Sequence, residues 1–283
     1  MFCLLLPTDM FAVELDQRSS EDTASRPAFT WFSGRRIFHA PQADIFQPRT
    51  GLFKYFDSEG LRIEVGYGIE PLHYRIDSTR EFALGGSFYA FGQIESVGPL
   101  ILQLLAADAF FGGYVAYREQ INERSSWLGQ IIVGHISSHF ADGRWDFTRG
   151  IWRDSVLPFG SSRDFLTLWG EYQYGAWRGY ASSRYAFQIR PRLNRWQWQV
   201  GTEFAPENAF AHHITPYISV DLKYMNPQGT FLPTLTLQSG IKFGPWRGQG
   251  INLYVLGYTG NNFYGLLFDE RIQFAAVGFK FDL

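Results

Sequence analysis

Long segments in which polar and apolar residues alternate constrain this fold more than any other feature of the sequence. In RIEVGYGIE (residues 62–70), one face of an extended strand carries only Ile, Val and Tyr, and the other carries Arg, Glu and Gly. Successive side chains of a strand point to opposite faces, so this segment has one apolar and one polar face. A soluble β-sandwich shows the same alternation but is built from shorter strands. The pattern therefore favours a transmembrane β-barrel with a polar lumen.

Segments of this kind follow one another from residue 51 to the end of the chain, without a linker between them. They are residues 51–57, 62–76, 80–94, 108–120, 125–141, 162–176, 178–190, 196–207, 212–225, 233–245, 252–265 and 271–283. A tilted strand needs roughly 9–11 residues to cross a bilayer, and most of these segments exceed that length. We predict an all-β fold, a transmembrane antiparallel β-barrel of about twelve strands with a short helix in one extracellular loop.

The composition agrees with a barrel in lipid. Aromatic residues make up 18% of the chain and charged residues only 18%, yet the mean hydropathy is −0.15, too polar for a helical membrane protein. Lipid-facing apolar residues and lumen-facing polar residues would average to such a value, and aromatic residues would form the interfacial girdles. The net charge of −2 provides no basic surface for nucleic acid, so we expect no such partner.

One stretch, residues 97–117, has the length and the apolar content of a membrane-spanning helix. A proline, a glutamine, an aspartate and a pair of glycines interrupt it. We therefore predict a short helix-like loop at 99–107, followed by a strand from residue 108.

The two ends of the chain predict export. Residues 1–12, MFCLLLPTDMFA, have the apolar part of a secretory signal without its basic start, which indicates a shortened signal or a disordered leader. Residues 13–49 are then expected to be an N-terminal periplasmic extension, and residues 50–283 the barrel. The final strand, VGFKFDL, is apolar and aromatic on alternate positions. It resembles the signal that the barrel-assembly machinery recognises, and so predicts the outer membrane of a Gram-negative bacterium.

The connections between the segments should be alternately short and long, because barrels of this kind have short periplasmic turns and longer extracellular loops. We expect inside turns at 77–79, 119–124 and 175–177. The expected outside loops are 95–107, 142–161, 226–232 and 261–270.

One polar cluster, GHISSHFADG at 134–143, could carry chemistry. On a strand, His135, Ser137 and His139 project from one face, near its external end. A serine hydroxyl becomes a nucleophile when a neighbouring base accepts its proton, and a histidine two residues away is close enough to do so. A third polar group should orient that histidine. The alternatives are a polar cluster inside the lumen, hydrogen-bonded to Arg and Glu of neighbouring strands, and a metal or ligand site.

Several segments carry a resemblance to known proteins: in order, PQADIFQPR, VGYGIEPLHYR, EFALGGSFYAFGQI, HISSHFADG, VGTEF and GYTGNNFYG with AAVGFKF. Through them, most of residues 40–283 resembles an uncharacterised family of outer-membrane proteins, which implies a barrel and no established activity. More distantly, the pattern is similar to outer-membrane phospholipase A, a twelve-stranded barrel with a lipid-facing His-x-Ser pair. A lipid A deacylase of the outer membrane also uses His-x-Ser, on a smaller barrel.

The phospholipase resemblance implies roles for particular residues. Ser137 would be the nucleophile and His135 its base, and Asp142, five residues past the serine, would help to bind calcium. The phospholipase orients its histidine with an asparagine, where this chain has Arg149, a cation without an acceptor. Asp164 on the next strand, or His139 on the same face, could replace that asparagine.

Three hypotheses for function follow. The first is a hydrolase that acts on outer-membrane phospholipid or lipid A, with calcium near Asp142 stabilising the oxyanion. The second is a passive pore for small solutes. Its narrow lumen would be lined by the charged residues Arg62, Glu64, Glu70, Arg75 and Lys280. The third is a non-enzymatic surface or assembly barrel whose loops bind a partner.

Overall fold

The protein is described by a computed structural model that covers residues 27–98, 101–153, 157–207, 209–225 and 232–283. The signal predicted at residues 1–12 lies outside these ranges.

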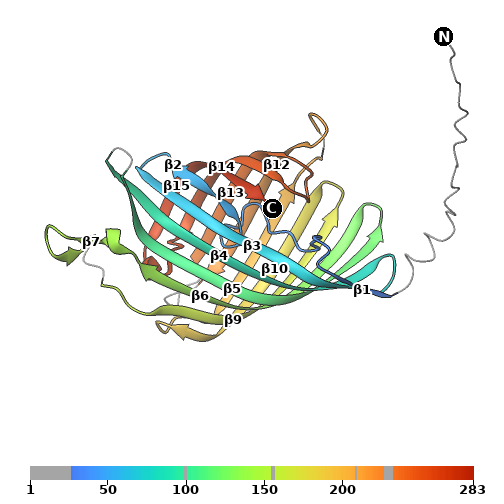
Figure 1. Cartoon of the computed structure of the whole chain (residues 1–283), viewed down its shortest axis with the longest axis horizontal. Helices are drawn as coiled ribbons and strands as arrows, with labels where there is room; N and C mark the ends of the chain where they lie inside the picture. Colours follow the sequence, from blue (N-terminus) through green and yellow to red (C-terminus); the bar gives the residue numbers. More distant parts are fainter. Residues whose placement is uncertain (1–26, 99–100, 154–156, 208, 226–231) are drawn as a thin grey trace, which may run out of the picture.

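Twelve antiparallel strands form a closed barrel (Figure 1). They are β2 (Thr50–Tyr55), β3 (Gly60–Arg75), β4 (Arg80–Gly98), β5 (Ile101–Asn122), β6 (Ser125–Phe140), β9 (Ser161–Tyr174), β10 (Trp177–Arg190), β11 (Trp196–Phe204), β12 (Ile214–Met225), β13 (Leu232–Phe243), β14 (Gly250–Asn261) and β15 (Arg271–Asp282). The barrel closes at β2, which pairs with β15 on one side and with β3 on the other. Closure satisfies the backbone hydrogen bonds that an open sheet edge would leave exposed to lipid. The predicted twelve-stranded barrel is confirmed.

The burial pattern follows the alternation of the sequence. On β3, Val65 and Ile69 are 54% and 51% exposed on the outer face, whereas Arg62 and Glu64, which precede them on the strand, are buried. The remaining predicted lumen residues also face inward: Glu70 and Lys280 are buried, and Arg75, past a bulge in β3, is half-buried.

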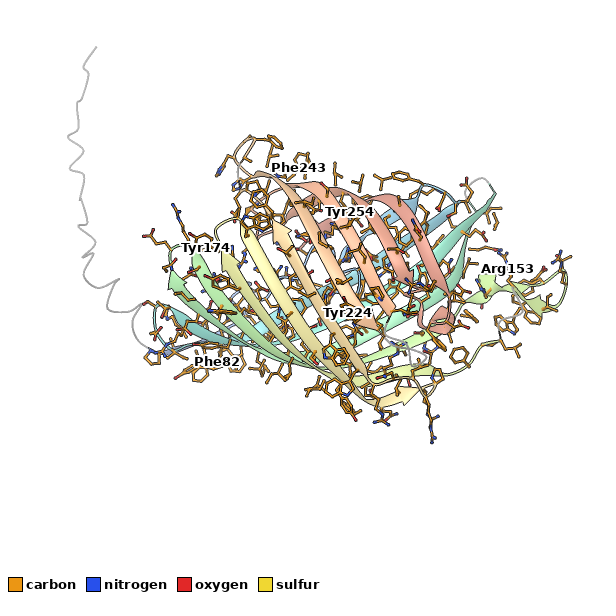
Figure 2. All side chains as sticks on the ribbon, turned by 180° about the vertical axis from the view of Figure 1, so that it is seen from behind. Phe82, Arg153, Tyr174, Tyr224, Phe243 and Tyr254 are labelled. Atoms are coloured by element: carbon orange, nitrogen blue, oxygen red, sulfur yellow. The ribbon has the colours of Figure 1, made fainter. Side chains whose placement is uncertain are left out.

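Aromatic side chains stand around the outer wall near one end of the barrel. Figure 2 shows Phe82, Tyr174 and Phe243 at the end where the strands are joined by short turns, and all three are exposed. Such a ring is typical of the girdle at a membrane interface.

The helix predicted at 99–107 is wrong over residues 101–107, which belong to β5; residues 99–100 lie outside the described ranges. β5 pairs with β4 from Ile101 onward. The apolar run concealed a strand because both of its faces are apolar: Leu104 is exposed on the outside, and Leu105 and Ala106 are buried. Short 3-10 turns form instead at Asp142–Arg144 and Gly265–Leu267. Among the described residues, no helix has the length and apolar content to cross a membrane.

Short turns join the strands at 76–79, 123–124 and 175–176, as predicted, but the alternation does not hold throughout the barrel. The expected loop at 95–107 is strand over most of its length, and the connection 205–213, at the short-turn end, is longer than 191–195 at the other end. The longest connection, 141–160, carries the small hairpin of β7 (Trp145–Asp146) and β8 (Ile151–Trp152). It projects from one end of the barrel, whereas β1 (Ala28–Trp31) lies at the opposite end, where it pairs with β3 (Figure 1).

Residues 37–49 lie inside the barrel, although we expected all of 13–49 to be an extension outside it. The backbone N–H groups of Ile37 and Phe38 donate to the Glu70 carboxylate at 2.6 and 3.1 Å. Further along, the Arg62 guanidinium donates to the carbonyl oxygen of Ile45 at 2.7 Å. Charged side chains of the wall thus satisfy backbone hydrogen-bonding groups of residues 37–49. The sequence alone did not predict that this segment lies in the lumen.

Asp44 anchors this segment to the far wall. Its carboxylate accepts from Lys223 Nζ at 2.7 Å and from Gln199 Nε2 at 2.7 Å, and all three side chains are buried. Burial alone would raise the pKa of Asp44, but the Lys223 charge and these hydrogen bonds lower it to about 2. The Asp44 carboxylate is therefore ionised at physiological pH.

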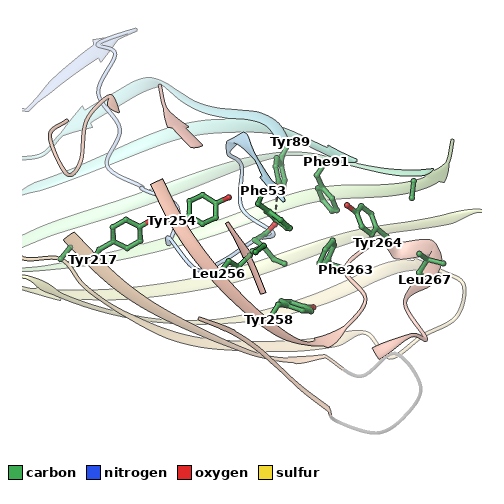
Figure 3. Close-up of a cluster of buried hydrophobic side chains, with 14 residues drawn as sticks. Phe53, Tyr89, Phe91, Tyr217, Tyr254, Leu256, Tyr258, Phe263, Tyr264 and Leu267 are labelled. Atoms are coloured by element: carbon green, nitrogen blue, oxygen red, sulfur yellow. Dashed lines mark hydrogen bonds between the residues drawn. The ribbon is translucent and has the colours of Figure 1, made fainter. Parts of the chain in front are cut away.

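An aromatic cluster fills the lumen toward the long-loop end (Figure 3). The β14–β15 connection folds inward and buries Phe263 and Tyr264 beside Phe91 of β4. The Arg62 guanidinium lies over the rings of Phe91 and Phe263, at 3.9 and 4.4 Å from their centroids. Beside residues 37–49 and this loop, the described residues enclose two small cavities, of about 80 and 50 Å³.

Candidate functional site

The polar trio of β6 lies on the outer wall of the barrel. Ile131 and Val133, on the same face, are 52% and 53% exposed, and His135, Ser137 and His139 continue that face toward the end of the strand. Their neighbours in sequence point into the lumen. The alternative of a lumen cluster is therefore wrong, because the period of the strand fixes the direction of all five side chains.

His135 is held by a carboxylate on the next strand. β6 and β9 pair so that His135 lies opposite Asp164, and the His135 Nδ1 to Asp164 Oδ1 distance is 2.6 Å. Phe111 of β5 stacks on the imidazole from the other side, with ring centroids 5.0 Å apart. When Nδ1 carries the proton donated to Asp164, Nε2 is free to accept another. The contact thus fixes both the orientation and the tautomer that a general base requires.

Ser137 occupies the next outward position along β6. Its pairing partners, Ala109 on β5 and Ser162 on β9, both have small side chains, and Ser137 is half-buried. Within the described parts of the chain, no hydrogen bond joins Ser137 Oγ to the imidazole. Contacts between nucleophile and base are often long in a ligand-free site and shorten when substrate binds.

The other predicted site residues do not join this group. His139 is exposed at the end of β6, beyond Ser137. Asp142 is exposed in the 3-10 turn that follows. Arg149 pairs with Asp146 within the same loop, at 3.7 Å. Of the residues considered as partners of His135, Asp164 is the one that is hydrogen-bonded to it.

Calcium binding finds no support in the side chains near Asp142. Across the described ranges, no group of three or more His, Cys, Asp or Glu side chains is arranged to hold a metal ion. A calcium site normally gathers six to eight oxygen ligands with several carboxylates among them. We therefore derive no step of the chemistry through calcium.

A second polar contact, which the sequence reasoning missed, lies directly behind the pair. The Ser138 hydroxyl donates to Asp108 Oδ2 at 2.8 Å, and the backbone N–H of Gly265 donates to the same oxygen at 2.9 Å. The β14–β15 loop is thereby fixed to the inner face of β5 and β6. A single aspartate within the apolar run of β5 was the available signal for a buried polar partner.

The fold is a closed, twelve-stranded antiparallel β-barrel, and solved structures of outer-membrane proteins share it. No family model and no curated protein sequence matches the chain. Outer membrane phospholipase A from Escherichia coli aligns over 83% of this chain and 92% of its own, with 10% identity and a TM-score of 0.53. The Salmonella typhi outer membrane phospholipase dimer with bound calcium aligns over 87% and 93%, with 9% identity and a TM-score of 0.53. The distant similarity expected from the sequence is confirmed at the level of the fold.

Proposed function

We propose that this barrel is a serine hydrolase that cleaves acyl esters of membrane lipids, with Ser137 as nucleophile, His135 as base and Asp164 orienting the base. The observation that carries the proposal is the 2.6 Å contact between His135 and Asp164 on the outer wall. A polar group in contact with hydrocarbon costs free energy, so a histidine and a carboxylate paired there favour a functional role.

The chemistry follows from these three side chains. Ser137 Oγ attacks the acyl carbonyl carbon as its proton passes to His135 Nε2, and Asp164 stabilises the resulting imidazolium. The tetrahedral intermediate then loses the alcohol portion of the lipid, whose oxygen takes the proton from His135. Water, deprotonated by the same imidazole, attacks the acyl-serine, and the imidazolium returns this proton to Ser137 Oγ as the fatty acid leaves. Every proton moves between serine, substrate, water and one imidazole.

The position of the pair favours a lipid substrate. Ser137 lies three residues before Phe140, the last residue of β6, which corresponds to roughly 10 Å along a strand. The acyl esters of a lipid lie at the boundary between hydrocarbon and headgroup, near the strand ends of a barrel. Phospholipid and the acyl groups of lipid A both present esters at this depth. The proposal places the protein in the outer membrane of a Gram-negative bacterium, inserted by the barrel-assembly machinery.

The pore alternative has less support, because residues 37–49 and the β14–β15 loop occupy the lumen. The inward charges named for that alternative mostly bind this segment or one another. Arg62, for example, pairs with Glu64 at 2.9 Å and also holds Ile45. A surface barrel without activity remains an outcome of the test below.

The test is fatty-acid release by the refolded chain from phospholipid and from lipid A, with and without added calcium. We expect release by the wild-type protein and loss of it in Ser137→Ala. Ser183→Ala is the matched control, because Ser183 is an outward serine of β10 outside the group, and it should retain activity. No release by the wild type from either lipid would overturn the proposal, and so would equal release by Ser137→Ala.

A further inference from the structure

A cavity of about 80 Å³ lies inside the barrel, on the opposite side of the wall from Ser137. Inward side chains of β6, β9 and β10 form one side of it. The β10–β11 and β14–β15 connections, residues of β5, β11 and β12, and Phe46 of the inner segment also line it. It is separate from the proposed hydrolase site, because β6 presents Ile136 and Ser138 to the cavity and His135 and Ser137 to the outside.

Two arginines line this cavity, and neither forms an ion pair with a carboxylate of the described residues. Arg163 of β9 forms no ion pair or hydrogen bond with any residue that the structure describes. Arg184 of β10 donates to Thr167 Oγ1 at 2.9 Å and lies over the Phe165 ring at 4.0 Å, and no carboxylate is within ion-pair distance of it among the same residues. The carboxylate that shares the cavity, Asp108, already accepts two hydrogen bonds through its Oδ2.

Arg178 and Lys223, which are also buried in the lumen, differ in this respect. Arg178 pairs with Glu171 and with Glu203, at 2.5 and 3.0 Å, and Lys223 pairs with Asp44 at 2.7 Å. A cation removed from bulk water is costly unless an opposite charge compensates it. Among the described residues, the two cavity arginines therefore lack the ion pairs that Arg178 and Lys223 form in the same lumen.

A further donor points to the same conclusion. Asn261, at the end of β14, lines the cavity and is 5% exposed, and its Nδ2 has no hydrogen-bond partner in the described part of the protein. Arg195 of the β10–β11 connection lines the cavity as well. Arg195 is exposed and donates to the carbonyl oxygen of Phe187 at 3.0 Å. Even without it, the charges of Arg163 and Arg184 outnumber the single carboxylate of Asp108, and the cavity has a net positive charge.

We propose that this cavity binds a small oxyanion, with Arg163 and Arg184 as its main ligands. Guanidinium groups bind phosphate and carboxylate oxygens through paired N–H donors, and their own cost of burial is offset by the bound charge. The cavity volume admits an inorganic anion or a single phosphate group. Its lining residues from two connections place it at the long-loop end of the barrel, so the phosphate could belong to a free solute or to a lipid headgroup that reaches over the rim.

The test is calorimetric titration of the full chain, refolded in uncharged detergent, with inorganic phosphate at constant ionic strength. We expect saturable binding of one phosphate per barrel, weakened at least tenfold in Arg163→Gln and in Arg184→Gln. Arg192→Gln is the control, because Arg192 is exposed on the β10–β11 connection and does not line the cavity. It makes the same change in net charge and should bind as the wild type does.

A parallel titration with micelles that contain phosphatidic acid distinguishes the sources. Binding of free phosphate identifies a solute site, and binding of the lipid phosphate alone identifies a headgroup site. Either result supports an oxyanion cavity if Arg163→Gln and Arg184→Gln abolish that binding. Heat-dependent mobility in detergent gels reports whether each variant is folded, and either arginine variant suffices if the other does not fold. No binding of either probe by the wild type would overturn the proposal, as would equal losses in Arg192→Gln.

Discussion

At the residue scale, the register between β6 and β9 decides what His135 can do. The period of the strand was enough to predict that His135, Ser137 and His139 share a face. The period could not show whether Asp164 or His139 orients the imidazole of His135. The register between β6 and β9 depends on the long 141–160 connection, so the residue of β9 opposite the histidine cannot be read from the spacing within β6. The structure pairs His135 with Asp164. It also shows Phe111 on the other face of the imidazole, a contact between strands that the spacing within one strand could not reveal.

Asp164→Asn tests the orienting role in the proposed hydrolase. The amide keeps the size of the side chain but removes the charge that stabilises the imidazolium, so kcat should fall by about 10²–10⁴-fold. KM should change little, because Asp164 does not bind the lipid in this mechanism. Steady-state hydrolysis at several lipid concentrations separates the two constants. Asp146→Asn, in the exposed loop, is the control and should leave both unchanged; a fall confined to 1/KM would contradict the orienting role.

At the scale of elements, close packing of tyrosines on glycines shapes the inner wall. Tyr180 of β10 lies across Gly201 of β11, its pairing partner, so closely that a Cβ added to the glycine would overlap the ring. The hydroxyl of Tyr180 donates to Asp221 at 2.8 Å and so fixes the ring in place. The sequence showed that barrel walls need glycines where bulk is excluded, but the residue that covers each glycine depends on the register.

Gly201→Ala should therefore destabilise the barrel by about 1–3 kcal/mol, because the methyl group displaces a hydrogen-bonded ring. Gly179→Ala is the matched control, since Gly179 is on the neighbouring strand and a Cβ there meets no atom within 4 Å. Unfolding by guanidinium chloride in lipid vesicles, followed by tryptophan fluorescence, measures both. Equal stability of the two variants would contradict the packing argument.

At the scale of the whole molecule, the filled lumen separates this barrel from an open channel. Residues 37–49 have no periodic pattern, and the side chains that hold them come from strands far apart in sequence, including β3, β10 and β12. The sequence could therefore predict the wall of the barrel but not its contents. The proposed hydrolase site needs only the outer wall, and the inner segment braces that wall from within.

The docking of this segment should weaken in mild acid. Loss of hydration in the lumen, with the charges of Arg247 and Arg36, holds the pKa of His39 well below its ordinary value of 6.5. The released segment would bind a proton more readily than the docked one, so docking is strongest above about pH 6.5 and weakens as the pH falls. Asp44, whose pKa is about 2, stays ionised in this range and keeps its ion pair with Lys223.

Hydrogen exchange of the amides of residues 37–49, corrected for the intrinsic rate, measures this effect. Protection should be lower at pH 5.5 than at pH 7.5 in the wild type, and the difference should shrink in His39→Gln. Equal protection at both values in the wild type would show that the histidine does not control docking.

The central claim, that Ser137 is an activated nucleophile on the outer wall, is tested most directly by covalent labelling. A fluorophosphonate phosphonylates a serine only when a base accepts its proton, and fluoride leaves as the oxygen–phosphorus bond forms. Intact-mass measurement of the refolded barrel should show one added group per chain, mapped to the peptide that contains Ser137 and absent from Ser137→Ala. An unmodified wild-type chain, or a label on another residue, would contradict the account.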